Sequence, residues 1–322
     1  MQFYKKREFG TLVGDTFLFF KEYGKNYFKN YFLINGLLLI ILMVLAVFGY
    51  REFFMQLVGG NTGGQSYFME QYFQQNSGIL IFLVVLFFIL AMAISVVSYS
   101  YPIFYLKRVS QTETKTVKSD EILGDIKNNF GRIIIMMLGL TFIVGPVFLI
   151  VFGISYLLML IVIGFFLLLL IAPATVNSVN FIMYDYLQTK KGFLESLSFA
   201  IRAQFSYPSH SEKTPFWKYW GTTIVIYFII NIVTSIFTFV PMIMYFASLV
   251  SVPSHGGGFE ENPFQGTMGI LFFVIYGISM LVSLVLMNVM LVASGLMYYD
   301  NRTDLHQQMD ILEIDSIGTH EG

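Results

Sequence analysis

The chain has 322 residues, of which 56% are hydrophobic, 18% aromatic and only 12% charged, with no cysteine and a net charge of −1. Soluble domains carry about 25% charged residues, so this composition is typical of an integral membrane protein. The lack of cysteine excludes disulfides and cysteine-ligated metals, and the lack of a surplus basic surface argues against nucleic acid as a partner.

Long apolar runs predict six membrane spans, since a helix needs about 20 apolar residues to cross a hydrocarbon core of about 30 Å. The runs cover residues 31–50, 79–103, 133–152, 155–176, 219–248 and 268–298. Residues 133–176 carry no charge, and we expect a tight turn at Phe152–Ser155 to divide them into two spans. The predicted fold is all-α, with one six-span domain over residues 1–302 and an acidic cytoplasmic tail over 303–322.

The distribution of basic residues predicts the orientation of the spans. All Lys and Arg residues except Arg51 fall in the segments 1–30, 106–132, 184–220 and 300–322. Cytoplasmic loops retain Lys and Arg, so we expect these segments and both termini to be cytoplasmic, and 51–77 and 251–267 to be outer loops. The acidic tail is expected either to be solvated or to dock on the basic segments or on a partner.

Three cytoplasmic segments show the periodicity of amphipathic helices: 8–30, 120–132 and, less regularly, 192–205. Such helices next to a span are expected to lie in the membrane surface, in contact with lipids. In the first of them an aromatic and apolar face is expected to meet lipid or the helix bundle. Its members include Phe9, Val13, Phe17, Phe20 and Tyr27.

These three segments also resemble one another, which predicts an internal repeat. Their openings read Leu12-Val13-Gly14-Asp15, Ile122-Leu123-Gly124-Asp125 and Phe193-Leu194-Glu195-Ser196, and each precedes a pair of spans. The second span of each pair ends in an aromatic cluster at the cytoplasmic side. We therefore expect three copies of a unit made of one surface helix and two spans, related by a pseudo-threefold axis along the membrane normal.

The cores of the predicted spans contain no ionisable side chain, which argues against a proton relay or acid–base catalysis within the membrane. Amide and hydroxyl side chains remain, and they have two interpretations: hydrogen bonds between helices, or a polar pocket. Pro173 favours the pocket at the residues that follow it, because a proline in a span frees a backbone carbonyl. The candidate pocket residues are Asn177, Ser178, Asn180, Asn231 and Asn288.

No pattern in the chain predicts a metal site, a cofactor or catalysis. His255 lies near Glu260 and Glu261, but zinc requires three or four ligands and the other histidines are scattered. Neither a dinucleotide-binding glycine pattern nor a phosphate-binding loop occurs. We therefore expect neither enzymatic activity nor a bound cofactor.

The two ends of the chain resemble a known group of proteins. The opening Arg7-Glu8-Phe9-Gly10 and the end Gly295-Leu296-Met297-Tyr298-Tyr299-Asp300, followed by an Asp-rich tail, are similar to the membrane domains attached to some bacterial glycerophosphodiester phosphodiesterases and to their stand-alone relatives. The resemblance implies a bacterial inner (plasma) membrane protein. No hydrolase domain is present here, so phosphodiesterase activity is not expected.

Two functions are consistent with these features. The first is a non-enzymatic scaffold or accessory subunit of a cell-envelope or lipid-handling complex, with other membrane or cytoplasmic subunits as partners. The alternative is a passive or partner-energised transporter of a neutral or amphiphilic solute.

Overall fold

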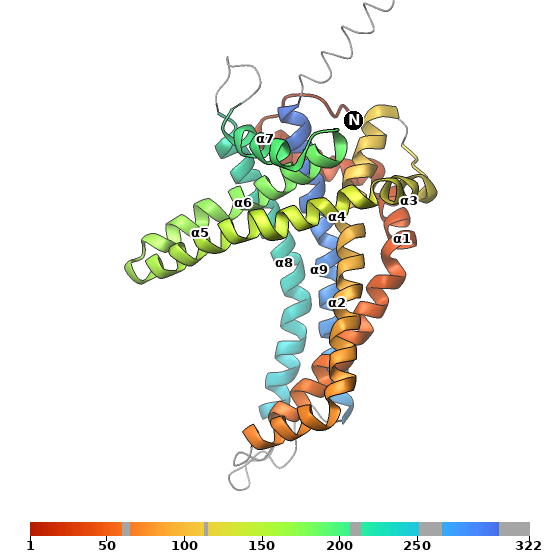
Figure 1. The fold of residues 1–322 in the computed structure, drawn as a ribbon, viewed down its shortest axis with the longest axis vertical. Helices are drawn as coiled ribbons and strands as arrows, with labels where there is room; N and C mark the ends of the chain where they lie inside the picture. The colour runs from red at the N-terminus through yellow and green to blue at the C-terminus, as the bar shows by residue number, and fades with distance from the viewer. Residues whose placement is uncertain (60–64, 113–114, 207–213, 251–265, 303–322) are drawn as a thin grey trace, which may run out of the picture. The chain divides into compact units, whose positions relative to one another are not determined.

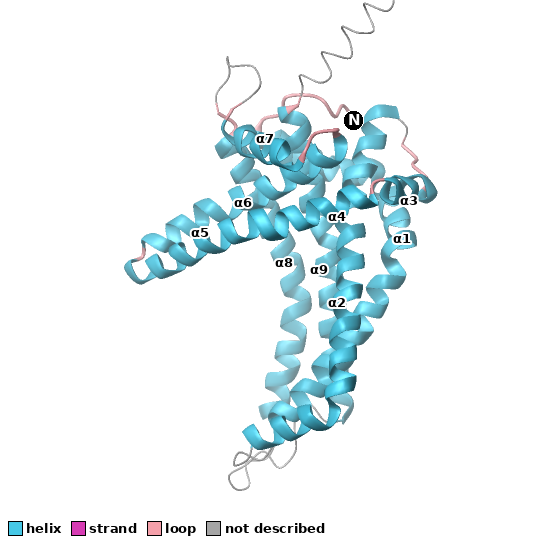
Figure 2. Ribbon diagram, viewed as in Figure 1, coloured by secondary structure: helices cyan, strands magenta, loops and turns pink. Residues whose placement is uncertain are grey.

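The structure, a computed structural model, describes residues 1–59, 65–112, 115–206, 214–250 and 266–302. These residues are helical apart from short connections, as Figure 2 shows. The helices in Figure 1 are α1 (Phe9–Gly59), α2 (Gln65–Thr112), α3 (Ser119–Asn128), α4 (Phe130–Gly139), α5 (Gly145–Leu157), α6 (Ile163–Gln188), α7 (Phe193–Phe205), α8 (Phe216–Val250) and α9 (Gly266–Asn301).

Six helices within the described ranges are long and apolar enough to cross a membrane, which confirms the predicted number of spans. By that criterion they cover Phe9–Arg51, Ser77–Thr112, Phe130–Ile161, Ile163–Gln188, Phe216–Val240 and Gly269–Asn301. Phe130–Ile161 covers the predicted span 133–152 and the first residues of 155–176, and each of the other five overlaps one predicted span, because apolar composition over about 20 residues decides both.

The chain forms two compact units. Unit 1 contains residues 1–34, 96–228 and, of the described C-terminal part, 288–302, and unit 2 contains 35–95 and 229–287. Both units take residues from α1, α2, α8 and α9, whereas α3 to α7 belong wholly to unit 1. Every Lys and Arg of the described residues except Arg51 is in unit 1.

The predicted boundary between the segment 8–30 and the span 31–50 is wrong, because both are parts of one continuous helix, α1. Within the expected outer loop 51–77, α1 continues to Gly59 and α2 begins at Gln65. The aromatic residues of 67–73, whose spacing predicts a short helix in this loop, do lie in a helix, α2. No proline occurs in α1, so nothing in its sequence interrupts the backbone hydrogen bonds where polarity changes. Helices do occur at the other two predicted amphipathic segments, as α3 and α7.

The turn between the third and fourth spans lies at Val162, not at the predicted Phe152–Ser155. Gly153 and Ser155 continue α5, and the Ser155 hydroxyl donates to the Val151 carbonyl. A 3-10 turn, η2 (Leu158–Ile161), precedes Val162, whose φ of 66° is in the left-handed region. Gly164 allows the two arms to meet, because a Cβ there would overlap the Ser155 carbonyl oxygen. Glycine therefore serves close packing here and a β-branched residue makes the turn.

One proline also shapes the first arm of this hairpin. A π-helical turn, η1 (Leu140–Val144), separates α4 from α5, and Pro146 follows it. Proline has no N–H to bond the carbonyl four residues earlier, and π-turns are a common response to such a gap.

The core of unit 1 is built from tyrosine. Tyr27, Tyr101, Tyr105, Tyr184 and Tyr298 are each almost completely buried, and they come from α1, α2, α6 and α9. Tyr27 packs edge-on against Tyr101 and Tyr105, with ring centroids 5.0 and 4.9 Å apart, and Tyr184 stacks on Tyr298 at 5.7 Å. Their hydroxyls are bonded as well: Tyr101 donates to the Tyr27 carbonyl at 2.6 Å and Tyr184 to the Leu291 carbonyl at 2.8 Å.

Unit 2 is held together by close approach of helices at small residues. A Cβ added at Gly277 would lie 2.5 Å from a Val47 methyl, so α1 and α9 touch there. Thr238 of α8 and Ser279 of α9 share a hydroxyl contact of 3.3 Å. Small residues at helix contacts are the usual way in which membrane helices pack.

Candidate functional site

The structure places four of the five candidate pocket residues in unit 1, where they make hydrogen bonds to other helices. Asn177 Oδ1 accepts from Thr223 Oγ1 at 2.6 Å, Asn180 Nδ2 donates to Ser294 at 2.8 Å, and Asn288 Oδ1 accepts from Tyr27 at 2.8 Å. Ser178 accepts from Gln204 of α7 at 2.6 Å. These are hydrogen bonds between helices, the first of the two interpretations.

The remaining features of the predicted pocket are dispersed. Asn231 belongs to unit 2, whereas the other four belong to unit 1, and the side chain of Asn231 is exposed. Asn177 Nδ2 is buried and has no hydrogen-bond partner. Asn177 Nδ2 is therefore the one group among these five residues that still supports the interpretation as a polar pocket.

The carbonyl that Pro173 frees is already bonded. Proline at position 173 removes the N–H that would bond the Leu169 carbonyl. The indole Nε1–H of Trp220, in α8, donates to the carbonyls of Leu169 and Leu170 at 3.2 and 3.1 Å. The proline thus creates a joint between α6 and α8.

The aromatic face of the first amphipathic segment divides between surface and core. Phe9 and Phe17 are 44% and 42% exposed, Val13 and Phe20 are half-buried, and Tyr27 is in the tyrosine core. Sequence reasoning missed Phe19, which is fully buried. The signal for it is the helical spacing of the buried residues Leu12, Asp15, Thr16, Phe19, Tyr23 and Tyr27, which an acidic member obscures.

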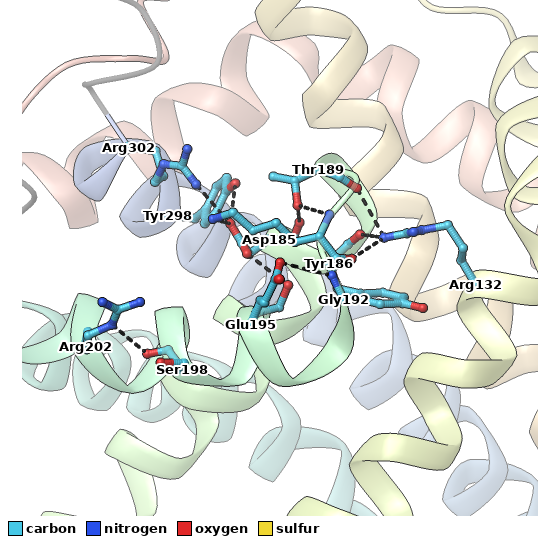
Figure 3. A network of polar contacts seen from close by, with 12 residues as sticks. Arg132, Asp185, Tyr186, Thr189, Gly192, Glu195, Ser198, Arg202, Tyr298 and Arg302 are labelled. Atoms are coloured by element: carbon cyan, nitrogen blue, oxygen red, sulfur yellow. Dashed lines mark hydrogen bonds and ion pairs between the residues drawn. The ribbon is translucent and has the colours of Figure 1, made fainter.

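Two buried carboxylates, also missed from sequence, form the most distinctive polar feature of unit 1. Asp185, near the end of α6, is fully buried (Figure 3). Its Oδ1 lies 3.0 Å from Arg302 Nη1, 3.4 Å from the Tyr298 hydroxyl and 3.6 Å from Lys191 Nζ. Its Oδ2 accepts from Ser196 of α7 at 2.9 Å. A buried carboxylate is stable only with such partners.

Asp300, at the end of α9, is the second buried carboxylate. Its Oδ2 accepts from Lys218 Nζ and from the Tyr219 hydroxyl, both at 2.6 Å. Its Oδ1 accepts from the backbone N–H of Arg7 at 2.5 Å, and Lys218 also donates to the Arg7 carbonyl at 2.7 Å. Asp300 therefore joins α8, α9 and the segment before α1.

Arg7 is itself buried, and its guanidinium is surrounded by oxygen. Nε donates to Asp15 Oδ2 at 2.8 Å, and the other nitrogens donate to the carbonyls of Gln2, Phe3 and Lys5 at 2.7 to 3.1 Å. Burial lowers the pKa of the Arg7 guanidinium, while the hydrogen bond and charge of Asp15 act in the opposite direction. The carbonyls and Asp15 thus replace the water that the cation loses.

Two further arginines hold helix ends in unit 1. Arg108 of α2 binds both carboxylate oxygens of Asp125 in α3, at 2.5 and 2.9 Å. Arg132 of α4 donates to the carbonyls of Tyr186, Thr189 and Lys191 at 2.6 to 3.2 Å and lies over the Tyr186 ring (Figure 3). A cation at the C-terminal end of a helix such as α6 bonds carbonyls that lack an intrahelical partner.

The oxygens of Asp185 and Asp300 all accept hydrogen bonds from cations, hydroxyls or a backbone N–H. Within the described residues no group of three or more His, Asp or Glu side chains is placed to hold a metal ion. The four histidines, including His255, lie outside the described residues.

Comparison with protein-family models, with curated proteins and with solved structures finds no match to this chain. The similarity to the membrane domains of glycerophosphodiester phosphodiesterases therefore stays a prediction from the two ends of the sequence.

Proposed function

We propose that this chain is a non-enzymatic scaffold or accessory subunit of a cell-envelope or lipid-handling complex in the inner membrane of a bacterium, with both termini in the cytoplasm. The observation that carries the proposal is the packing of unit 1. Its buried amides, tyrosines and carboxylates bond to one another across helices. A transport pathway needs polar groups that face a cavity, whereas a scaffold needs a rigid, internally bonded bundle.

The proposed orientation is supported by the grouping of the basic segments. The described parts of all four belong to unit 1, and unit 2 holds only Arg51. Because Lys and Arg mark the cytoplasmic side, we assign these basic segments of unit 1 to that side of the membrane.

The polarity of α7 supports contact with lipid at this side. Its inward face consists of Ser196, Ala200, Ala203 and Gln204, all buried. Its outward face carries Leu194, Ile201 and Phe205, which are 51 to 66% exposed, beside the exposed Glu195, Ser198 and Arg202. Large apolar side chains next to charged ones on the outer face fit a helix that lies in the membrane surface.

A threefold repeat is supported by three links in unit 1. The aligned positions of the three surface helices are Asp15, Asp125 and Ser196. Asp125 binds Arg108 near the end of α2, and Ser196 binds Asp185 near the end of α6. Asp15 binds Arg7, whose backbone binds Asp300 at the end of α9. The second and third surface helices are thus each joined to the end of the span that precedes them. The first surface helix is joined, through Arg7, to the end of the last span.

The partner would dock through the acidic tail 303–322, and this is testable in native membranes. Tagged chain is purified in mild detergent beside two variants: a deletion of 303–322 and a full-length chain with the tail's acidic residues changed to amides. We expect a defined set of subunits with the wild type and at least tenfold less of it with both variants. Recovery of the same subunits from all three chains would count against the tail as the docking segment. Recovery of no subunits from any of them would count against a scaffold.

Asn177 favours the transporter as the second candidate, since its Nδ2 is buried and unbonded. Liposomes that contain the purified chain alone distinguish the two functions. A scaffold gives no solute uptake with or without a pH gradient. Uptake that Asn177→Leu abolishes, while the conservative Ile182→Leu leaves it intact, would favour the transporter.

A further inference from the structure

Residues 3–7 contact the helices of unit 1 in the way that a bound peptide contacts its receptor. The receptor residues come from three helices: Asp15 and Tyr23 of α1, Lys218 and Tyr219 of α8, and Tyr299 and Asp300 of α9. Residues 3–7 precede all of these helices and form no helix themselves.

The backbone of Arg7 is held from both sides. Asp300 accepts from its N–H and Lys218 donates to its carbonyl, while Lys218 and Asp300 form an ion pair of 2.6 Å with each other. Tyr219 holds the same carboxylate from α8. A carboxylate and an ammonium group arranged in this way bind the backbone N–H and C=O of one residue whatever its side chain, as in other modes of recognition of extended peptides.

Side chains add selectivity to this backbone contact. The guanidinium of Arg7 meets Asp15, which Lys5 also approaches at 2.9 Å. Four positions earlier, the buried ring of Phe3 lies between Tyr23 and Tyr299, with centroids 6.1 and 6.0 Å away. Aromatic anchors and a charge-assisted bond are the groups that supply most of the affinity in peptide sites.

We propose that Asp15, Tyr23, Lys218, Tyr299 and Asp300 form a binding site for an extended peptide with an aromatic residue four positions before an arginine, and that residues 3–7 of this chain occupy it. The occupied site closes the third of the three links described above. A partner segment with the same chemistry competes for the site and opens that link. The inference is independent of the proposed scaffold function, because it concerns a contact within the chain.

The test uses the full chain, which lacks cysteine, with Phe3→Cys as a reporter. A buried thiol reacts only while the segment is released. A synthetic peptide of residues 1–8 that captures the released state should accelerate labelling by a factor of about one plus its concentration over its Kd, so roughly tenfold at ten times Kd. The same peptide with Arg7→Gln should have little effect. A chain with the exposed Lys6→Cys instead serves as the control whose labelling the peptide leaves unchanged.

A second measurement avoids any effect of Phe3→Cys on the segment. A fluorescent peptide of residues 1–8 should bind the full chain with Arg7→Gln more tightly than the wild type, since the internal competitor is weakened, and should not bind the chain with Asp300→Asn. Labelling of Phe3→Cys that is insensitive to the peptide, together with no binding to the Arg7→Gln chain, would overturn the proposal. Equal binding to the Asp300→Asn chain would also overturn it.

Discussion

Replacing Asp185 by asparagine should destabilise the folded chain strongly. The side chain keeps its size but loses its charge, so the 3.0 Å contact of Arg302 is no longer an ion pair. The exposed fractions of the two side chains are 0% and 9%, so the remaining cation cannot recover its hydration without movement of the end of α9. Breaking a buried pair in this way costs about 3–5 kcal/mol of unfolding free energy.

The other partners of Asp185 add little to this figure. Lys191 is 39% exposed and lies 3.6 Å away, and exposed pairs contribute about 0–1 kcal/mol. Ser196 can still donate to the asparagine oxygen. The expected loss is therefore that of the Arg302 pair, near the lower end of the range.

Arg108→Gln provides the matched control. Its pair with Asp125 is shorter, at 2.5 Å, but the two side chains are 32% and 28% exposed. Reversible unfolding in mixed detergent micelles, followed by circular dichroism, gives both changes in free energy. We expect at least about 3 kcal/mol for Asp185→Asn and less than about 1 kcal/mol for Arg108→Gln. Losses that agree within about 0.5 kcal/mol would refute the reasoning, because burial would then make no difference.

Two further predictions concern contacts between helices and use the same unfolding assay. Trp220→Phe removes the indole donor to the carbonyl that the proline in α6 frees, and should cost about 1–3 kcal/mol, whereas the same change at the exposed Trp217 should be close to neutral; equal effects would contradict the assignment. Gly295→Ala places a methyl group 2.5 Å from the Tyr184 hydroxyl and should destabilise by about 1–3 kcal/mol, whereas Gly153→Ala meets no atom within 4 Å and should be neutral or stabilising.

The spans were predictable from sequence because they depend on composition over about 20 residues. Their joints were not. Gly153 and Ser155 have the residue types of a turn, yet they continue a helix, and the chain reverses at Val162 instead. A glycine can lie inside a helix or end it, and the local sequence is the same in both cases. Only the tertiary contacts of the folded chain decide between the two.

The buried charges were not predictable for a different reason. Asp185 and Arg302 are 117 residues apart, and each lies at a helix end where a charged residue is expected in water. Asp15 falls on the polar side of the amphipathic pattern, and its burial depends on Arg7, which precedes the helix. The candidate amides were more predictable. Asn177, Asn180 and Asn288 could be recognised from sequence as polar residues within the spans, whereas their hydrogen-bond partners could be identified only in the folded structure.

The most direct test of the account is the side of the membrane on which each connecting segment lies. Single cysteines at Thr62, His255, Thr116 and Ser209 in the cysteine-free chain are exposed to an impermeant thiol reagent in intact cells. With the basic segments on the cytoplasmic side, Thr62→Cys and His255→Cys are labelled, and Thr116→Cys and Ser209→Cys react only after the membrane is permeabilised. Labelling of Thr116→Cys or Ser209→Cys in intact cells, or protection of the other two, would contradict the account.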